Sequence, residues 1–165
     1  MNNTCFQREI IHYNSSLFYH LIDACYLITM DNSSRRNRYI SQLNTYKPFH
    51  KINIIHNKGF KKCKKEEWIK NTADDLSDIY GKIFEECLQT NINKVLIFED
   101  DFFFTEHIQK IQNYILDIQI FLDQHPNFMT YNLGPLSWFM CPSSLYSNHY
   151  IYKGGVAHCV VYSRR

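Results

Sequence analysis

The 165-residue chain has few of the residues that mark fibrous or disordered proteins. It contains only 5 Gly and 4 Pro, which excludes a collagen-like or low-complexity repeat. Its 16% aromatic and 45% hydrophobic residues exclude a chain that is disordered throughout. The net charge of +2 falls well short of the basic surface that is typical of a nucleic-acid-binding domain. We therefore expect a folded domain with no nucleic acid among its partners.

No run of apolar residues approaches the roughly 18 that a transmembrane helix needs. Charged side chains such as Arg8, Glu9 and Asp23 interrupt the partly apolar first thirty residues, so these residues do not form a signal-peptide core. The 6 cysteines include no C-x-x-C pair, the spacing typical of zinc and redox sites. We expect a cytoplasmic protein with no transmembrane segment and with free thiols, although the even number of cysteines leaves disulfides open.

Short apolar runs alternate with amphipathic segments along the chain. The strands expected from runs rich in β-branched and aromatic residues are 24–29, 51–56, 95–98, 128–133 and 156–162. The helices expected from apolar residues three and four apart begin at Ser33 or Ser34, at about residue 74 and at about Thr105. This alternation is typical of an α/β fold with a mainly parallel central sheet flanked by helices. Residues 1–21 show no clear period and are interpreted as an irregular lead-in to a single domain over 22–165.

The strand expected at 95–98 stops at three consecutive carboxylates, Glu99, Asp100 and Asp101. In open α/β sheets, ligands bind beyond the carboxyl ends of the strands, where these side chains lie. Alternation along an extended chain places Glu99 and Asp101 on one side and Asp100 on the other. Glu99 and Asp101 are therefore candidate ligands of one hard cation, Mn²⁺ or Mg²⁺, bridging to the phosphates of a nucleotide. The alternative is a solvated turn that places negative charge at the start of the next helix.

Three arginines, Arg35, Arg36 and Arg38, follow the first expected strand and form a second candidate site. Their guanidinium groups offer paired N–H donors that suit the phosphate or sugar oxygens of a nucleotide. The same three residues also suit the solvated face of a helix. The choice depends on whether the first strand ends within reach of Glu99, Asp100 and Asp101.

Several other residues have both a functional and a structural interpretation. His158 is either a metal ligand or a packed histidine, and the packed form is the more common one. Trp138 and Phe139 lie in a long aromatic loop over 137–148 and either stack on a base or sugar or fill a gap in the core. The lysine-rich loop 58–65 is interpreted as solvated.

Four blocks of this sequence, taken together, resemble glycosyltransferase family 25. The first is YLITMD (26–31) followed by RRNR (35–38), which is similar to an apolar strand and an arginine-rich segment of that family. The others are VLIFEDD (95–101), LG (133–134) and GGVAHCVVYSR (154–164), which look like its VLILEDD, LG and GG-x-AYLISR segments. The blocks occur in the family's order over about residues 24–165.

The resemblance implies a GT-A-like nucleotide-sugar fold and a metal-dependent, inverting transfer of a hexose from a UDP-sugar to a hydroxyl. The acceptor would be a saccharide, a lipid-linked sugar or a protein, as for the family's lipopolysaccharide-sugar and collagen transferases. Glu99 and Asp101 fall on the two acidic positions of a D-x-D-like motif that holds ribose and metal. The donor-binding residues that we expect are Glu99, Asp100, Asp101, Arg35, Arg36 and Arg38. No catalytic base is assigned.

The chain departs from the family in two places. Ser77-Asp78 stands near the position where the family often carries Ser-His, and Asn32-Ser33-Ser34 replaces a proline-containing turn. The family continues beyond its last block, so we also expect the domain to be incomplete at its C-terminal end. Two alternatives stay open. One is a truncated, non-catalytic relic that binds a nucleotide or a partner, and the other is a metal-dependent phosphotransfer or nuclease-like enzyme using the same carboxylates.

Overall fold

The computed structural model describes residues 5–104, 112–125, 130–133, 135–136, 139–142, 150–153, 156–157 and 159–164. One sheet contains the strands β1 (Phe6–His12), β2 (Ala24–Met30), β3 (Lys51–Asn57), β4 (Lys94–Glu99), β5 (Thr130–Asn132) and β10 (Cys159–Ser163). Short antiparallel pairs join β6 (Pro135–Leu136) to β9 (Val156–Ala157) and β7 (Phe139–Pro142) to β8 (Tyr150–Lys153).

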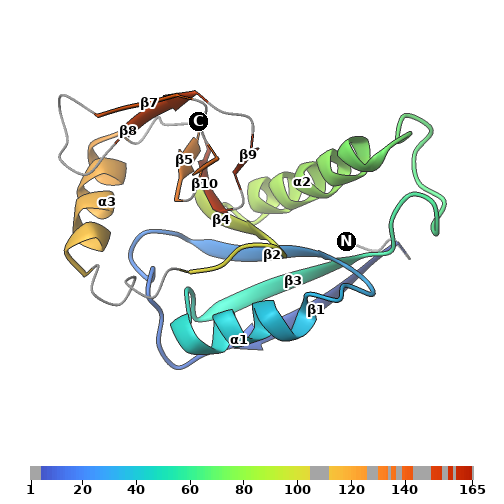
Figure 1. Ribbon diagram of the computed structural model, residues 1–165, viewed down its shortest axis with the longest axis horizontal. Helices are drawn as coiled ribbons and strands as arrows, with labels where there is room; N and C mark the ends of the chain where they lie inside the picture. The colour runs from blue at the N-terminus through green and yellow to red at the C-terminus, as the bar shows by residue number, and fades with distance from the viewer. Residues whose placement is uncertain are drawn as a thin grey trace.

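In the described part of the chain, the helices beside the sheet are α1 (Arg36–Tyr46), α2 (Thr72–Gln89) and α3 (Gln112–Gln124). Figure 1 shows α1 and α2 on opposite sides of the strands. Asn71 caps α2, because its side chain accepts hydrogen bonds from the backbone N–H groups of Ala73 and Asp74. Within the described residues, none of these helices is long and apolar enough to cross a membrane. The chain is thus an α/β protein, as its alternating pattern predicts.

The sheet is mixed rather than mainly parallel. Its strand order is β1-β3-β2-β4-β10-β5; β2 pairs in parallel with β3 and β4, whereas the other three pairings are antiparallel. Helical crossovers through α1 and α2 join β2, β3 and β4, and such crossovers produce parallel neighbours. The expectation of a mainly parallel sheet is corrected by β1 and β10, which run against their neighbours. Because β10 opposes both β4 and β5, β5 points the same way as β2, β3 and β4.

Residues 6–12 form the edge strand β1, so the expectation of irregular structure over 1–21 is wrong there. β1 pairs with β3 along its whole length, from Phe6 opposite Asn57 to His12 opposite Lys51. The consecutive charged residues Arg8 and Glu9 break the alternation that would have revealed a strand. Backbone pairing with β3 therefore defines this strand more than an apolar face does.

The central strands divide the hydrophobic core between the two faces of the sheet. Leu27 and Phe98 pack with residues of α1 and α3, while Tyr26 and Ile97, one position earlier, pack with residues of α2. All four of these side chains are 1% exposed or less. The unbroken apolar runs of β2 and β4 are thus explained by burial on both faces.

A disulfide joins Cys5, just before β1, to Cys63 in the loop between β3 and α2. The expectation of free thiols is therefore wrong for this pair, whereas Cys25 and Cys87 are buried and form no disulfide. The two bonded cysteines are 58 residues apart in sequence. They meet because β1 runs antiparallel to β3, which brings the start of β1 beside the loop that leaves β3.

The lysine-rich loop 58–65 is not solvated throughout. The side chain of Lys65 is only 2% exposed and forms ion pairs with Asp75 and Asp78 of α2, its Nζ lying 3.6 Å from Asp78 Oδ2. Its Nζ also donates to Asn57 Oδ1 at 2.9 Å and lies 4.1 Å from the centre of the Phe6 ring. The expectation of a wholly solvated loop is therefore wrong at Lys65, which fastens the loop to the first turns of α2.

Replacing Lys65 by alanine is expected to lower the free energy of unfolding by about 3 kcal/mol, because a buried carboxylate then loses its cation. Lys82 still pairs with Asp78, so Asp75 bears most of the loss. Urea denaturation measures the change, with Lys64→Ala at an exposed lysine of the same loop as the control. The control is expected to shift stability by less than about 0.5 kcal/mol. Equal stability of the two variants would contradict a structural role for Lys65.

Candidate functional site

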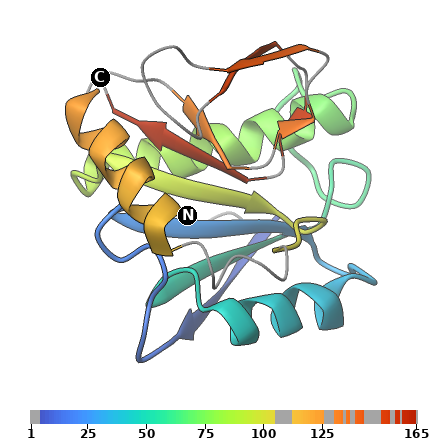
Figure 2. The same ribbon diagram turned by 60° about the vertical axis from the view of Figure 1, so that its left-hand side comes forward.

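The carboxyl ends of the central strands β2 and β4 lie side by side at one end of the sheet, where Ile28 is opposite Glu99 (Figure 2). From β2 the chain crosses through α1 to β3 on one side, and it returns through α2 to β4 on the other side of β2. The strand order thus reverses at β2, which is the type of position where open α/β sheets bind ligands. Glu99 is the last residue of β4, so the expected position of the acidic triplet at the end of a central strand is confirmed.

Asp100 is the centre of a hydrogen-bond cluster that joins this end of β4 to the end of β2. Its Oδ2 accepts from Thr29 Oγ1 at 2.9 Å and from Ser33 Oγ at 2.6 Å, and its Oδ1 accepts from the Arg35 guanidinium at 2.7 Å. Burial acts to raise the pKa of this carboxyl, but the bonds from Ser33, Arg35 and Thr29 outweigh it and hold the pKa below its usual range. Asp100 is therefore a charged group that organises its surroundings.

Arg35 remains open to solvent on its outer side while it pairs with Asp100. Its side chain is 51% exposed. The hydrogen bond to Asp100, followed by the negative charges of Asp100 and Asp101, raises the pKa of the guanidinium. Asp101 itself is half-buried in the turn after β4. Arg35 thus presents a fixed positive charge at the switch point, close to two carboxylates.

Glu99 faces the opposite side of the sheet from Asp100, as alternation along the strand predicts. The Tyr80 hydroxyl of α2 donates to Glu99 Oε1 at 3.2 Å. Burial, with the neighbouring Tyr162 and Glu99 acting in the same direction, raises the pKa of the Tyr80 hydroxyl, so it stays a donor. The triplet therefore has side chains on both faces of the sheet, with Glu99 on the α2 side and Asp100 on the α1 side.

Helix α1 begins later than the expected cap at Ser33 or Ser34. Its N-cap is Arg35, and its first residue is Arg36. The Ser33 hydroxyl accepts from the backbone N–H of Arg35 at 3.2 Å and donates to Asp100. Ser33 is thus used to hold the strand end of the site together, and the helix starts beyond it.

The three candidate arginines point to different partners. Arg36 forms two 2.9 Å hydrogen bonds to the carboxylate of Glu9 on β1, which raise its pKa. The guanidinium carbon of Arg38 lies 5.7 Å from the centre of the Phe103 ring, just after the acidic triplet. The structure therefore brings Arg35 and Arg38 to the segment that carries the triplet and directs Arg36 to the edge strand β1.

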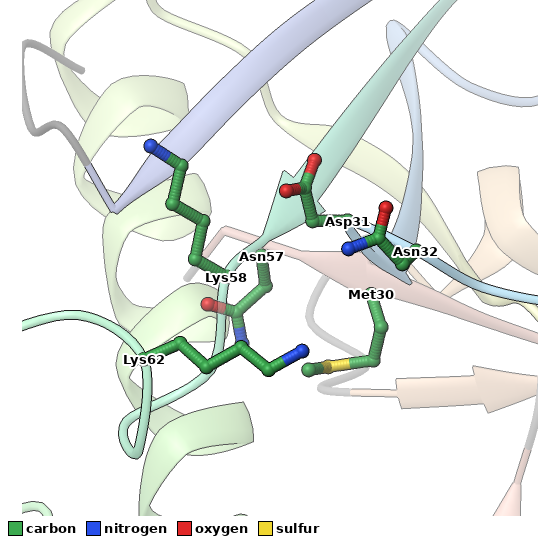
Figure 3. A pocket seen from close by; sticks show the side chains of 6 residues that line it. All are labelled: Met30, Asp31, Asn32, Asn57, Lys58 and Lys62. Atoms are coloured by element: carbon green, nitrogen blue, oxygen red, sulfur yellow. The ribbon is translucent and has the colours of Figure 1, made fainter.

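A depression of about 180 Å³ lies at the carboxyl ends of β2 and β3, and none of the triplet residues lines it (Figure 3). Its lining residues follow the ends of β2 and β3 and are Met30, Asp31, Asn32, Asn57, Lys58 and Lys62. The side chains of Lys62 and Met30 extend toward each other across it. The Asn57 side chain donates to Asp75 of α2 at 3.0 Å, which places the depression on the α2 side. The only feature of the sequence that could have pointed to these lining residues is their position after the ends of expected strands.

Glu99 and Asp101 are the carboxylates expected to hold a cation. Within the described part of the chain, no group of three or more His, Cys, Asp or Glu side chains forms a metal site. Mg²⁺-type cations are often held by one or two carboxylates together with waters and substrate phosphates, and a cation held by Glu99 and Asp101 stays a prediction. Asp100 does not suit this mode, since its oxygens already accept three hydrogen bonds.

Part of the sequence-based site lies outside the described residues. His158, Trp138, Gly134 and the glycines of the 154–164 block are among these. Phe139 belongs to β7, so the expectation of one continuous loop over 137–148 is wrong at this position.

No protein-family model matches the chain, and a search of curated proteins finds no significant match. The resemblance to glycosyltransferase family 25 therefore rests on its sequence blocks, and the function drawn from it is a proposal.

Acid is expected to weaken the fold through Asp100, and Asp100→Asn isolates this effect. The folded-state pKa of Asp100 is lowered relative to about 3.9 in an unfolded chain, so its stabilising contribution is complete above about pH 4. That contribution is lost as the pH falls through the folded-state value. The parent should exceed Asp100→Asn in stability by about 1 kcal/mol or more at pH 7, with the difference shrinking toward pH 2.

Urea denaturation between pH 7 and pH 2 measures this difference. Asp123→Asn is the matched control, because Asp123 is 57% exposed and pairs only weakly, at 3.3 Å, with Lys94 at the other end of β4. A difference between parent and Asp100→Asn that stays constant with pH would show that the charge of Asp100 is not what stabilises the cluster.

Proposed function

We propose that this protein is a glycosyltransferase that transfers a hexose from a UDP-sugar to an acceptor hydroxyl, with inversion and with Mn²⁺ or Mg²⁺. The observation that supports this most is the contact between two of the sequence blocks that resemble family 25. Arg35 of the first block pairs with Asp100 of the second across 65 residues of sequence. The contact lies at the switch point of the sheet, where α/β proteins bind nucleotides. The α/β layers are consistent with a GT-A-like fold, which is part of this proposal.

The charges at this edge suit the diphosphate of a nucleotide-sugar. Arg35 offers an exposed guanidinium, and Lys58 and Lys62 line the neighbouring depression. Cationic side chains bind phosphate oxygens through charge-assisted hydrogen bonds. Asp31 and Asn32 add hydrogen-bonding groups for the nucleoside part of the donor. In this arrangement the nucleotide lies along the depression with its diphosphate toward Arg35.

The transfer itself requires that the acceptor oxygen attack the anomeric carbon as the bond from that carbon to the diphosphate oxygen breaks. Glu99 and Asp101 would hold the cation, which supplies neutralisation of the charge that develops on the departing diphosphate. The proton of the acceptor hydroxyl passes to a general base. The described residues assign no side chain to that base, so the proposal commits to the donor side of the site.

Replacing Asp101 by asparagine is expected to abolish the metal-dependent part of UDP binding. The change keeps the shape of the side chain but removes the charge that a divalent cation needs from its ligand. Titration calorimetry with UDP should show at least a tenfold loss of affinity in Mn²⁺ and little change without it. The fold should remain, since Asp101 is not among the residues that bond Asp100.

Asp123→Asn is the matched control for this experiment as well, because it removes the same charge at the opposite end of β4. A substitution at the exposed Lys62 would not serve as a control, because this residue lines the depression that is assigned to the nucleotide. Metal-dependent UDP binding that survives Asp101→Asn at full strength would show that the metal ligand is misassigned. Absence of UDP binding by the parent chain, with or without metal, would reject the transferase. UDP binding without transfer to any acceptor would favour the non-catalytic relic.

A further inference from the structure

The segment that follows the acidic triplet holds one exposed aromatic ring, Phe103, between the buried Phe102 and the half-buried Phe104. Phe102 is 4% exposed, and its ring centre lies 4.5 Å from that of Phe98 in the core. Phe104 lies 5.7 Å from the same ring, and its backbone N–H donates to Gln42 of α1 at 2.7 Å. Phe103, between these anchors, is 65% exposed, the highest value among the large hydrophobic side chains of the described residues. Core packing therefore accounts for its neighbours but not for Phe103.

Helix α1 and this segment make two contacts in register. Asp100 bonds Arg35, and three positions further along both segments the guanidinium of Arg38 lies 5.7 Å from the ring centre of Phe103. Residues three apart on a helix lie on the same side, so Arg35 and Arg38 form one row that faces residues 100–103. Arg38 is itself exposed. The Phe103–Arg38 pair is thus a direct continuation of the candidate site.

We propose that Phe103 and Arg38 form the binding surface for a sugar ring of the acceptor, an inference that rests on the proposed transferase function. The C–H groups on one face of a pyranose carry partial positive charge, and the face of an aromatic ring is negative. A sugar ring therefore stacks on the side of Phe103 that Arg38 leaves open. The guanidinium of Arg38 retains N–H donors for the hydroxyls or the carboxylate of that sugar.

The position of this pair favours the acceptor over the nucleotide. The depression assigned to the nucleotide is on the α2 side of the strand ends, where Asn57 bonds Asp75. Phe103 and Arg38 are on the α1 side, and the Arg35–Asp100 pair lies next to them. A nucleotide on one side and a sugar ring on the other would meet at the triplet, where the transfer would occur.

The test measures binding of the protein, with UDP and Mn²⁺ present, to an immobilised array of neutral and acidic oligosaccharides. Phe103→Ala is expected to weaken binding to the oligosaccharides that the parent binds by at least tenfold, while Phe103→Trp, which keeps an aromatic face, retains it. The affinity for UDP, measured separately by calorimetry, should stay within twofold of the parent. Leu88→Ala is the matched control, since Leu88 is 55% exposed on α2, and it should change neither value.

Four outcomes decide the inference. A parent chain that binds no oligosaccharide, or a Phe103→Ala variant that binds them as tightly as the parent, would overturn it. Loss of UDP affinity in Phe103→Ala with unchanged oligosaccharide binding would assign the ring to the nucleotide and also overturn it. Oligosaccharide binding that depends on Phe103, in a chain that binds no UDP, would support the sugar-binding surface and reject the transferase.

Discussion

A carboxylate buried at the end of a strand stays charged only when donors surround it, and Asp100 imposes this requirement on one edge of the molecule. Its donors are Thr29 at the end of β2, Ser33 in the following turn and Arg35 at the cap of α1. These residues precede Asp100 by 65 to 71 positions, so the bonds depend on the parallel pairing of β2 with β4, which brings the two strand ends together. The same bonds then determine where α1 begins and where Arg35 points.

The opposite side of the edge uses a second carboxylate in the same way. Asp75, 4% exposed in the first turn of α2, accepts hydrogen bonds from Asn57 at the end of β3 and from the backbone N–H of Phe60, and it pairs with Lys65. The loop between β3 and α2 is thereby held against the helix, and the Cys63 disulfide ties it to the start of β1. Each side of the candidate site is therefore positioned by one acidic group that joins a strand end to a helix start.

The parts of this fold that sequence predicts are those that local periodicity encodes. β2, β3, β4 and α2 follow from apolar runs and from spacings of three and four residues, because burial on one or both faces leaves that pattern in a single segment. β1, the Cys5–Cys63 disulfide and the burial of Lys65 leave no such pattern. Each depends on which distant segments meet across the β1–β3 pairing. The direction of β10 is likewise a property of the pairing and not of its own residues.

The candidate site shows the same limit at the level of single residues. Alternation in the sequence predicts that Asp100 faces away from Glu99, and the structure places Asp100 among its donors on the α1 side and Glu99 beside Tyr80 of α2. The sequence also identified the arginines as a cluster, yet successive residues of a helix are about 100° apart. Arg36 consequently turns to Glu9 on β1, whereas Arg35, the cap of the helix, and Arg38 lie toward the triplet. Spacing within a charged run, more than its total charge, therefore separates Arg36, which pairs with β1, from Arg35 and Arg38, which lie toward the triplet.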